Sequence, residues 1–186
     1  MNRNQHGKLI APIVGPKFEE VISAEIPDWN REKPRRFWDP SRKLLMSIRH
    51  YQYWRDRGGR LSTYFCRWSV LRHRFWSVVT ASDIPLNCKI GGGLLIPHPN
   101  GIVIHPHAEI GVNCLIFQQV TVGTRDEAGA PRIEGHVDIG AGAKVLGPVR
   151  VGAHARIGAN AVVARDIPSG TVAVGIPAKV IADLIR

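Results

Sequence analysis

An aliphatic residue recurs at every sixth position through the C-terminal half of the chain, and this period constrains the fold more than any other feature. The longest run keeps its register over six repeats, and two shorter runs precede it. Glycine often follows the aliphatic residue, and a small or aliphatic residue stands four positions after it. The recurring positions are Ile84, Ile90 and Ile96; Ile104, Ile110, Ile116 and Val122; and Ile133, Ile139, Val145, Val151, Ile157 and Val163.

A period of six residues predicts a parallel β-helix. In this arrangement each hexad forms one short strand and one turn, with the aliphatic side chain pointing into a narrow prism and the small residue packing at a corner. Three hexads make one coil, and coils stack at about 4.8 Å, the spacing between β-strands. A single coil cannot bury its own faces, so several must stack, and the recurring positions predict roughly four coils.

The register of the hexads shifts at two places, in the segments PHPNGIV (97–103) and GTRDEAGAPR (123–132). Insertions in a repeat protein form loops outside the stacked body, often on the face that binds ligands. His98 stands between two prolines in the first of these segments, which makes it a candidate functional residue.

The composition divides the chain into two regions, 1–80 and 81–186. The first region holds 16 Lys and Arg against 7 Asp and Glu, and it contains all five Trp and all three Tyr. The second region holds 9 Lys and Arg against 8 Asp and Glu. We therefore predict a basic, aromatic-rich helical region followed by the β-helix, with residues 1–30 forming an arm or a partly disordered segment.

Two helices are predicted in the basic region, over 42–56 and 60–79. The second carries an apolar stripe at helical spacing, which consists of Leu61, Tyr64, Phe65, Trp68, Leu71, Phe75 and Val79. We predict that the stripe packs on the β-helix or on a neighbouring subunit. The alternative is a basic amphipathic surface in peripheral contact with anionic lipid head groups. Nucleic-acid binding is not expected, because basic charge alone is weak evidence and no recognised binding motif is present.

The sequence has no apolar run of the length needed to span a membrane, and its N-terminus lacks the features of a signal peptide. The three cysteines, Cys66, Cys88 and Cys114, show neither a pairing pattern nor a zinc-binding motif. Such usage is typical of a reducing compartment. We therefore expect a cytoplasmic protein, with membrane association through the basic region left open.

Several segments together resemble those of the left-handed β-helix acyltransferases, most closely the serine acetyltransferase family. They are DIPLNCKIGGGLLIPHPNGIVI, IFQQVTVGT, VDIGAGAKVLGPVRVGAHARIGANAVVARDIP and AVGIPAKVI, and they extend from Asp83 to Ile181. The ending GIPAKV is specific to acyltransferases of this type. The resemblance implies a left-handed coil, a homotrimer, acetyl-CoA as co-substrate in a groove between adjacent β-helices, and no metal.

The resemblance also implies site residues. Asp83 and His98 stand at the fifteen-residue separation of the family's aspartate and histidine base. An imidazole can take the proton of a hydroxyl as it attacks a thioester, and a carboxylate on the far ring nitrogen fixes the tautomer. The residues implied for acetyl-CoA are Gly123, Ala141 and Ala159 along the pantetheine arm, and Lys179, with Lys144 as a further candidate, at the nucleotide end.

Departures from the family bear on the acceptor. The family has an aspartate immediately before the histidine, where this chain has Pro97. The family's Asp-Arg-His-Pro stretch, whose arginine holds the carboxylate of serine and whose histidine is a second imidazole, reads AGAP at 128–131 here. Asp39, in the sequence DPS, is a candidate counterpart of an aspartate that helps bind serine in the family. Arg125 is a further candidate contact to the acceptor.

We therefore predict an acetyl-CoA-dependent O-acetyltransferase that acts on a sugar hydroxyl in surface-polysaccharide synthesis, because a site without that arginine lacks an obvious partner for a carboxylate. Serine, as in cysteine biosynthesis, is the alternative acceptor. A zinc carbonic anhydrase on the same β-helix would need two histidines five residues apart, and the sequence has no such pair in this region. His136 and His154 lie one coil apart and should stack on an outer face. A non-catalytic β-helix scaffold is the remaining alternative.

Overall fold

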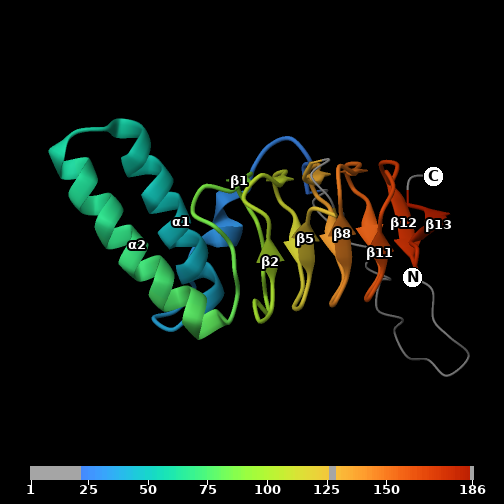
Figure 1. Ribbon diagram of the computed structural model, residues 1–186, viewed down its shortest axis with the longest axis horizontal. Helices are drawn as coiled ribbons and strands as arrows, with labels where there is room; N and C mark the ends of the chain where they lie inside the picture. Colours follow the sequence, from blue (N-terminus) through green and yellow to red (C-terminus); the bar gives the residue numbers. More distant parts are fainter. Residues whose placement is uncertain (1–21, 126–128, 185–186) are drawn as a thin grey trace, which may run out of the picture.

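The computed structural model describes residues 22–125 and 129–184. Short strands wrap around one axis in stacked coils, and a helical hairpin lies at one end of the stack (Figure 1). The strands are β1 (Lys89–Ile90), β2 (Val103–Ile104), β3 (Glu109–Ile110), β4 (Leu115–Ile116), β5 (Thr121–Gly123), β6 (Arg132–Ile133), β7 (Asp138–Ile139), β8 (Lys144–Leu146), β9 (Arg150–Val151), β10 (Arg156–Ile157), β11 (Val162–Val163), β12 (Thr171–Val174) and β13 (Lys179–Asp183).

These strands form three sheets, one for each side of a prism. The strand orders are β1-β3-β6-β9, β2-β5-β8-β11 and β4-β7-β10-β12-β13, so that each strand pairs with its equivalent one coil away. The pairs are parallel, except that β13 folds back antiparallel on β12 at the C-terminal end. The predicted parallel β-helix is therefore confirmed, with a stack of the predicted height.

The recurring aliphatic residues form the core of the prism. All of them are at most 9% exposed, and the small residues four positions later are buried as well. The strand register places equivalent hexad positions on top of one another, as Ile116 on Ile139 and Ile139 on Ile157. The six-residue period thus places an aliphatic side chain in the core at each hexad, as predicted. Each coil buries its faces only against the neighbouring coils.

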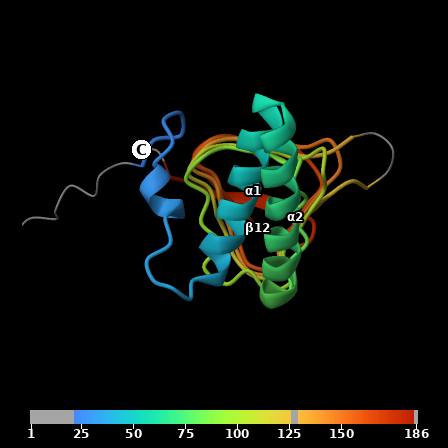
Figure 2. The same ribbon diagram turned by 90° about the vertical axis from the view of Figure 1, so that its left-hand side faces the viewer.

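Two helices form an antiparallel hairpin that lies across the first coil (Figure 2). Helix α1 (Pro40–Arg57) and helix α2 (Arg60–Thr80) lie within two residues of the predicted bounds. The connection is Gly58-Gly59, whose φ angles of 65° and 96° are in the left-handed region that glycine adopts readily. Leu44, Leu45 and Ile48 of α1 are buried in the core that continues into the β-helix.

The apolar stripe of α2 does not pack on the β-helix, and that part of the prediction is wrong. Most of its side chains are exposed in the single chain, Leu61 by 74% and Leu71 by 58%, for example. The contact of α2 with α1 includes both small and aromatic side chains. Ser62 and Ser69 are buried, the Ser62 hydroxyl donates to the Trp54 carbonyl, and Phe65 of the stripe stacks on the Trp54 ring. Small side chains at a helix contact allow a close approach of the two axes. Packing of the stripe on a neighbouring subunit stays a prediction.

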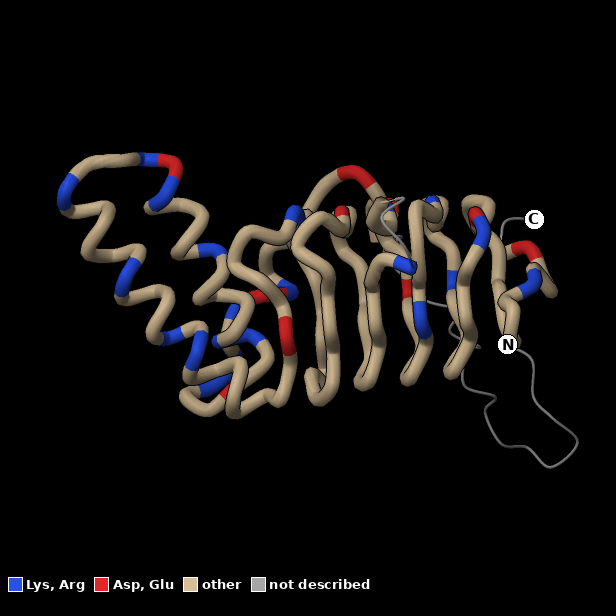
Figure 3. The backbone as a smooth tube through the Cα atoms, in the orientation of Figure 1, with Lys and Arg blue, Asp and Glu red and all other residues tan. Residues whose placement is uncertain are grey.

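Lys and Arg residues are concentrated on the two helices and are sparser along the coils (Figure 3). On α2, Arg60, Arg67 and Arg74 are exposed beside the apolar stripe. Neither α1 nor α2, nor the 3₁₀ turn that precedes them in the described chain, is long and apolar enough to cross a membrane. Contact of this basic surface with lipid head groups stays a prediction.

Residues 22–32 run as an arm along one corner of the β-helix and include the short 3₁₀ helix η1 (Trp29–Glu32). The buried side chain of Asn113 holds this arm. Its amide nitrogen donates to two carbonyls of the arm, and its amide oxygen accepts a hydrogen bond from the Asp28 N–H at 2.8 Å. The described part of the predicted arm thus packs on the coils, and residues 1–21 lie outside the described chain.

A buried ion pair joins the arm, α1 and the first coil. Glu32 is 7% exposed, and its two carboxylate oxygens accept hydrogen bonds from Arg49 at 2.8 and 3.0 Å. The same guanidinium donates to the carbonyls of Ile90 and Gly91, and Glu32 also accepts from the Leu94 N–H at 3.1 Å. This contact fixes both ends of the segment between η1 and α1 against the β-helix.

Candidate active site

A cavity of about 610 Å³ lies where the segment before α1 meets the loop that carries His98. His98 and Asp39 both line it, although they belong to separate regions of the sequence. Arg35, Arg36 and Trp38 belong to the same wall as Asp39. The structure therefore brings the candidate base and the candidate acceptor-binding aspartate to one place.

Asp39 is a buried carboxylate immediately before α1, with 4% exposure. Its Oδ2 accepts hydrogen bonds from the backbone N–H of Arg35 at 3.2 Å and from the Nε of Arg35 at 3.3 Å. Burial acts to raise the pKa of Asp39, but the hydrogen bonds and charge of Arg35 and the charge of Arg42 outweigh it and hold that pKa below its ordinary value. Asp39 is thus ionised at neutral pH, and Arg35 is its cationic partner in the described chain.

His98 is exposed, on a loop whose backbone is restrained. Pro97 and Pro99 flank it, and each proline ring limits the conformation of its own residue and of the residue before it. The N–H of Gly101 donates to the carbonyl of Ala81 at 2.8 Å and ties the loop to the start of the β-helix. The imidazole is therefore accessible on a firm support, as a base that meets a diffusing substrate must be.

Asp83 lies beside this loop. Its backbone pairs with Val103 and forms hydrogen bonds with Ile102 and Ile104, so the segment with Asp83 runs alongside the chain that follows the His98 loop. No hydrogen bond joins the Asp83 carboxylate to the His98 imidazole within the described chain. Catalytic hydrogen bonds are often long until substrate is bound, and the Asp83–His98 pair stays a prediction.

The corner of the prism that holds the His98 loop continues through the next coils. Backbone hydrogen bonds connect its turns in succession, from the N–H of Gln119 to the carbonyl of Asn100, from Gly142 to Gln118 and from Asn160 to Ala141. Ala141 and Ala159 therefore stack at this corner, two and three coils beyond His98, or about 10 and 14 Å away at the spacing of strands. A line of small side chains thus leads away from the candidate base.

Lys179 lies at the C-terminal end of the same corner. It opens β13, and the N–H of its neighbour Ala178 donates to the carbonyl of Val162 at 2.8 Å. The Nζ of Lys144 donates to two carbonyls of this corner at 2.7 and 3.0 Å. Both lysines therefore lie along the line that begins at His98.

Gly123 and Arg125 lie elsewhere. Gly123 ends β5 and pairs with Leu146, at the other end of the strands that begin at this corner. Arg125 is exposed in the loop that follows, and neither residue lines the cavity at His98. A single chain does not bring them to the predicted groove, and their roles in a groove formed by two chains stay predictions.

Sequence reasoning missed three polar side chains of this region. Arg35 and Arg36 line the cavity, and the only available signal was their place just before Asp39. Gln118 belongs to the corner between His98 and Ala141, and its Oε1 is buried with no hydrogen-bond partner in the part of the chain that the structure describes. A ligand at this corner would supply that missing partner.

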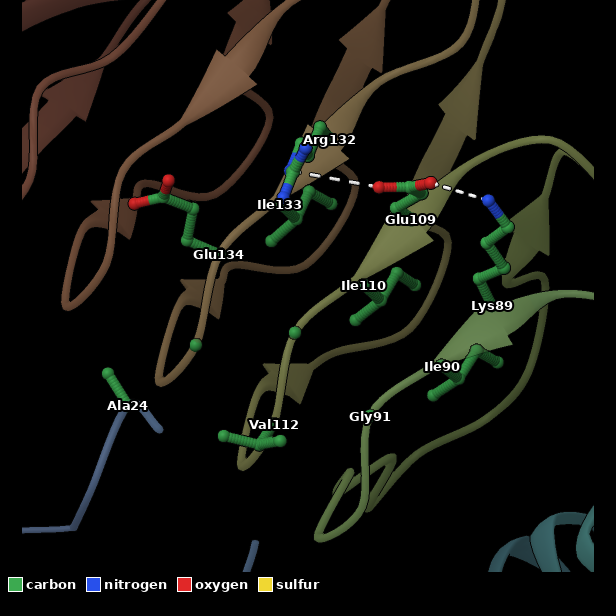
Figure 4. Close-up of a pocket in the computed structure, with 12 residues that line it drawn as sticks. Ala24, Lys89, Ile90, Gly91, Glu109, Ile110, Val112, Arg132, Ile133 and Glu134 are labelled. Atoms are coloured by element: carbon green, nitrogen blue, oxygen red, sulfur yellow. Dashed lines mark hydrogen bonds and ion pairs between the residues drawn. The ribbon is translucent and has the colours of Figure 1, made fainter. Parts of the chain in front are cut away.

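A second hollow, of about 530 Å³, lies on the outer face of β1, β3 and β6 beside the arm (Figure 4). Glu109 lies between two cations there, with Oε1 2.8 Å from the Nζ of Lys89 and Oε2 3.7 Å from the Nε of Arg132. The hydrogen bond from Lys89 and its charge lower the pKa of Glu109. Glu109 pairs with Lys89 and Arg132, and Glu134 pairs with Arg150. None of the predicted site residues lines this hollow, so the cavity at His98 is the better candidate site.

The buried cysteines Cys88 and Cys114 and the histidine pair His136 and His154 do not add to this site. Cys88 and Cys114 are buried, and burial raises the pKa of each thiol to about 11, so neither is a thiolate at neutral pH. His136 and His154 stack one coil apart, as expected, with their Nδ1 atoms 2.7 Å apart. Within 22–125 and 129–184, no group of three or more His, Cys, Asp or Glu side chains is arranged to hold a metal ion.

Comparison with known sequences agrees with the repeat. Residues 130–165 match the family model described as bacterial transferase hexapeptide (six repeats). The serine acetyltransferase of Mycobacterium tuberculosis (strain ATCC 25618 / H37Rv) is 43% identical over 110 residues, which are 58% of this chain and 48% of that protein. The serine acetyltransferase of Helicobacter pylori (strain J99 / ATCC 700824) is 45% identical over 106 residues, which are 55% of this chain and 62% of that protein. The chain therefore spans less than two thirds of the length of these relatives.

Comparison with solved structures extends the likeness to the helical region. The structure of serine acetyltransferase in complex with coenzyme A from Brucella abortus strain S19 matches with a TM-score of 0.67 and 27% identity, over 81% of this chain and 61% of that one. The expected left-handed β-helix with preceding helices is confirmed by this match. The chain is thus a hexapeptide-repeat β-helix that is similar in sequence and fold to the serine acetyltransferases.

Proposed function

We propose that the protein is an acetyl-CoA-dependent O-acetyltransferase whose acceptor is serine or a similar hydroxy amino acid. The observation that carries the proposal is the meeting of His98 and Asp39 in one cavity, at the start of the corner that carries Ala141 and Ala159. Relatives named serine acetyltransferase, and a solved complex of one with coenzyme A, support this reaction class. They also favour serine over the sugar hydroxyl expected from the sequence.

In the proposed reaction His98 acts as general base. The acceptor oxygen forms a bond to the acetyl carbon, the thioester C–S bond breaks, and the proton taken by His98 passes to the leaving thiolate. Imidazole suits both steps because it titrates near neutral pH. Asp83, which runs beside the His98 loop, is proposed to orient the ring and to stabilise the imidazolium that forms.

Acetyl-CoA is proposed to lie along the corner of small side chains. Its pantetheine arm would pass Ala141 and Ala159, and the Oε1 of Gln118 would find there the hydrogen-bond partner that it lacks within the described chain. Lys179, at the far end, suits the phosphates of the nucleotide. Gly123 is proposed to contribute from a neighbouring chain of a homotrimer, and Arg125 to contact the acceptor in the same way.

Filling this corner tests the proposed groove. Ala159→Trp is expected to weaken acetyl-CoA binding by about ten-fold or more, because ligand sites are largely preformed and a bulky side chain excludes the ligand. Isothermal titration with acetyl-CoA measures the effect. Ala153→Trp, the same change in the equivalent turn of another corner, serves as control. An unchanged affinity in Ala159→Trp, or an equal loss in both variants, would show that the groove lies elsewhere.

The choice of acceptor is tested by the thiol released from acetyl-CoA in the presence of L-serine, neutral sugars and nucleotide sugars. We expect kcat/KM for L-serine to reach about 10⁴ M⁻¹s⁻¹ or more, within the usual range of enzymes, and to exceed that for every sugar. The physical reason is the ionised Asp39 carboxylate, which suits an ammonium group.

A sugar hydroxyl is the second candidate acceptor. Gly129 and Ala130 stand where the family has its carboxylate-binding arginine and second imidazole, and this observation favours a neutral, polyhydroxylated acceptor. A higher kcat/KM for any sugar than for L-serine would replace the proposed acceptor with this one. Release of no thiol above background with any acceptor would remove the O-acetyltransferase proposal altogether.

A further inference from the structure

The charges that line the cavity at His98 do not balance. Arg35 is paired with Asp39, with the Nε and Oδ2 atoms 3.3 Å apart. The guanidinium of Arg42, which also acts on Asp39, donates to the Lys33 carbonyl. Arg36 makes no hydrogen bond or ion pair with any residue of 22–125 or 129–184, although it lines the same cavity. Among the described residues, one guanidinium of the wall therefore has no counterion.

The adjacent backbone favours negative charge at the same place. The N-cap residue of helix α1 is Asp39, whose side chain makes no capping hydrogen bond, and the first turn of the helix carries no acidic residue. Pro40 and Ser41 line the cavity beside Arg36. The N-terminal end of a helix of this length carries a partial positive charge. An anion bound beside Arg36 would therefore interact favourably with the guanidinium and with the helix end.

We propose that Arg36 binds the carboxylate of the acceptor and determines which hydroxyl compounds enter the site. The inference rests on the proposed function and deepens it. The cavity then offers a guanidinium for a carboxylate, the ionised Asp39 for an ammonium, and His98 for the hydroxyl. A small zwitterionic hydroxy acid carries all three groups, whereas a neutral sugar carries only the last. Arg36, in the segment before α1, thus takes the role of the carboxylate-binding arginine that the family has where this chain has Gly129.

The test uses Arg36→Gln, with Arg74→Gln, an exposed arginine of α2 outside the cavity, as matched control. Steady-state rates are measured with L-serine and with serinamide, which keeps the ammonium and hydroxyl but lacks the carboxylate. Arg36→Gln is expected to raise KM for L-serine by about 10- to 100-fold, the range for a hydrogen bond between charged groups. The KM for serinamide should change by less than about two-fold, because that amide does not use the charged contact. Arg36→Lys should recover part of the loss.

Three kinetic results would overturn the proposal. One is an unchanged KM for L-serine in Arg36→Gln, and another is an equal loss for L-serine and serinamide, which would indicate general damage to the site. The third is a loss confined to a sugar phosphate offered as a further acceptor, which would assign Arg36 to a phosphate and not to a carboxylate.

Calorimetric binding of L-serine without acetyl-CoA separates this proposal from the reaction itself. If the natural chain releases no thiol with any acceptor but binds L-serine with a Kd that Arg36→Gln weakens, the O-acetyltransferase is lost and the carboxylate site stands. If L-serine does not bind, or binds equally well to Arg36→Gln, the carboxylate site is overturned whatever the activity.

Discussion

Replacing His98 with alanine is expected to lower the turnover of acetyl transfer by about 10²- to 10⁴-fold, the usual contribution of a positioned general base. Among the described residues that line the cavity with Asp39, His98 is the one histidine. Its side chain is exposed and makes no hydrogen bond within the described chain, so its removal should leave the stability of the fold nearly unchanged. The rate of thiol release at saturating acetyl-CoA and acceptor measures the effect.

His107→Ala is the matched control for this experiment. His107 is an exposed histidine that follows a proline near the start of the β-helix, as His98 does, but it lies outside the cavity. The His107→Ala variant should retain the turnover of the natural chain. Near-normal turnover in His98→Ala would remove this imidazole from the mechanism, and an equal loss in both variants would mean that neither change reports on the base.

Replacing Arg49 with alanine is expected to have the largest effect on stability. Breaking a buried ion pair by removing one partner costs about 3–5 kcal/mol, because the remaining charge stays buried without compensation. The charge left behind is Glu32, which is 7% exposed, and the carbonyls of Ile90 and Gly91 lose their donor as well. The Arg49 side chain is 19% exposed, so water partly reaches the pair. We therefore expect the free energy of unfolding to fall by about 3 kcal/mol, the lower end of that range.

Urea denaturation at one fixed protein concentration measures this loss, since association shifts apparent stability. Arg55→Ala is the control in the same helix, because Arg55 and its partner Asp56 are exposed by 46% and 67% and such pairs contribute about 1 kcal/mol or less. Arg49→Ala should also weaken acceptor binding, since the ion pair holds the segment that carries Asp39. A loss of stability no larger than that of Arg55→Ala would show that the Glu32–Arg49 pair does not hold the hairpin on the coils.

The positions of His98, Ala141 and Ala159 on one corner follow from the sequence, because the hexads and loops of one solenoid determine how many residues separate them. The meeting of His98 with Asp39 does not follow in the same way. Asp39 belongs to the region before the repeat, and no period relates it to the coils. The partner of the α2 stripe does not follow from the sequence for a similar reason, since an amphipathic pattern marks an apolar face without saying what covers it; in the single chain that face is mostly exposed.

Arg36 shows most clearly that the sequence does not indicate which residues outside the repeat line the cavity. In the sequence it is one of many arginines in a basic region, and only the cavity and the partners of its neighbours set it apart. The sequence pointed to a sugar acceptor because it lacks an arginine at position 129. The tertiary structure supplies a guanidinium from the segment before α1, on the same wall as Asp39.

The sequence by itself determined the β-helix, its core and the loop that carries His98, because each coil contacts only its neighbours and a local six-residue period is enough to specify such contacts. Only the tertiary structure decided how the helical hairpin lies across the first coil and which side chains complete the cavity there. That placement depends on single long-range contacts, such as those of Arg49 with Glu32 and with the carbonyl of Ile90, which no periodic pattern in the chain encodes.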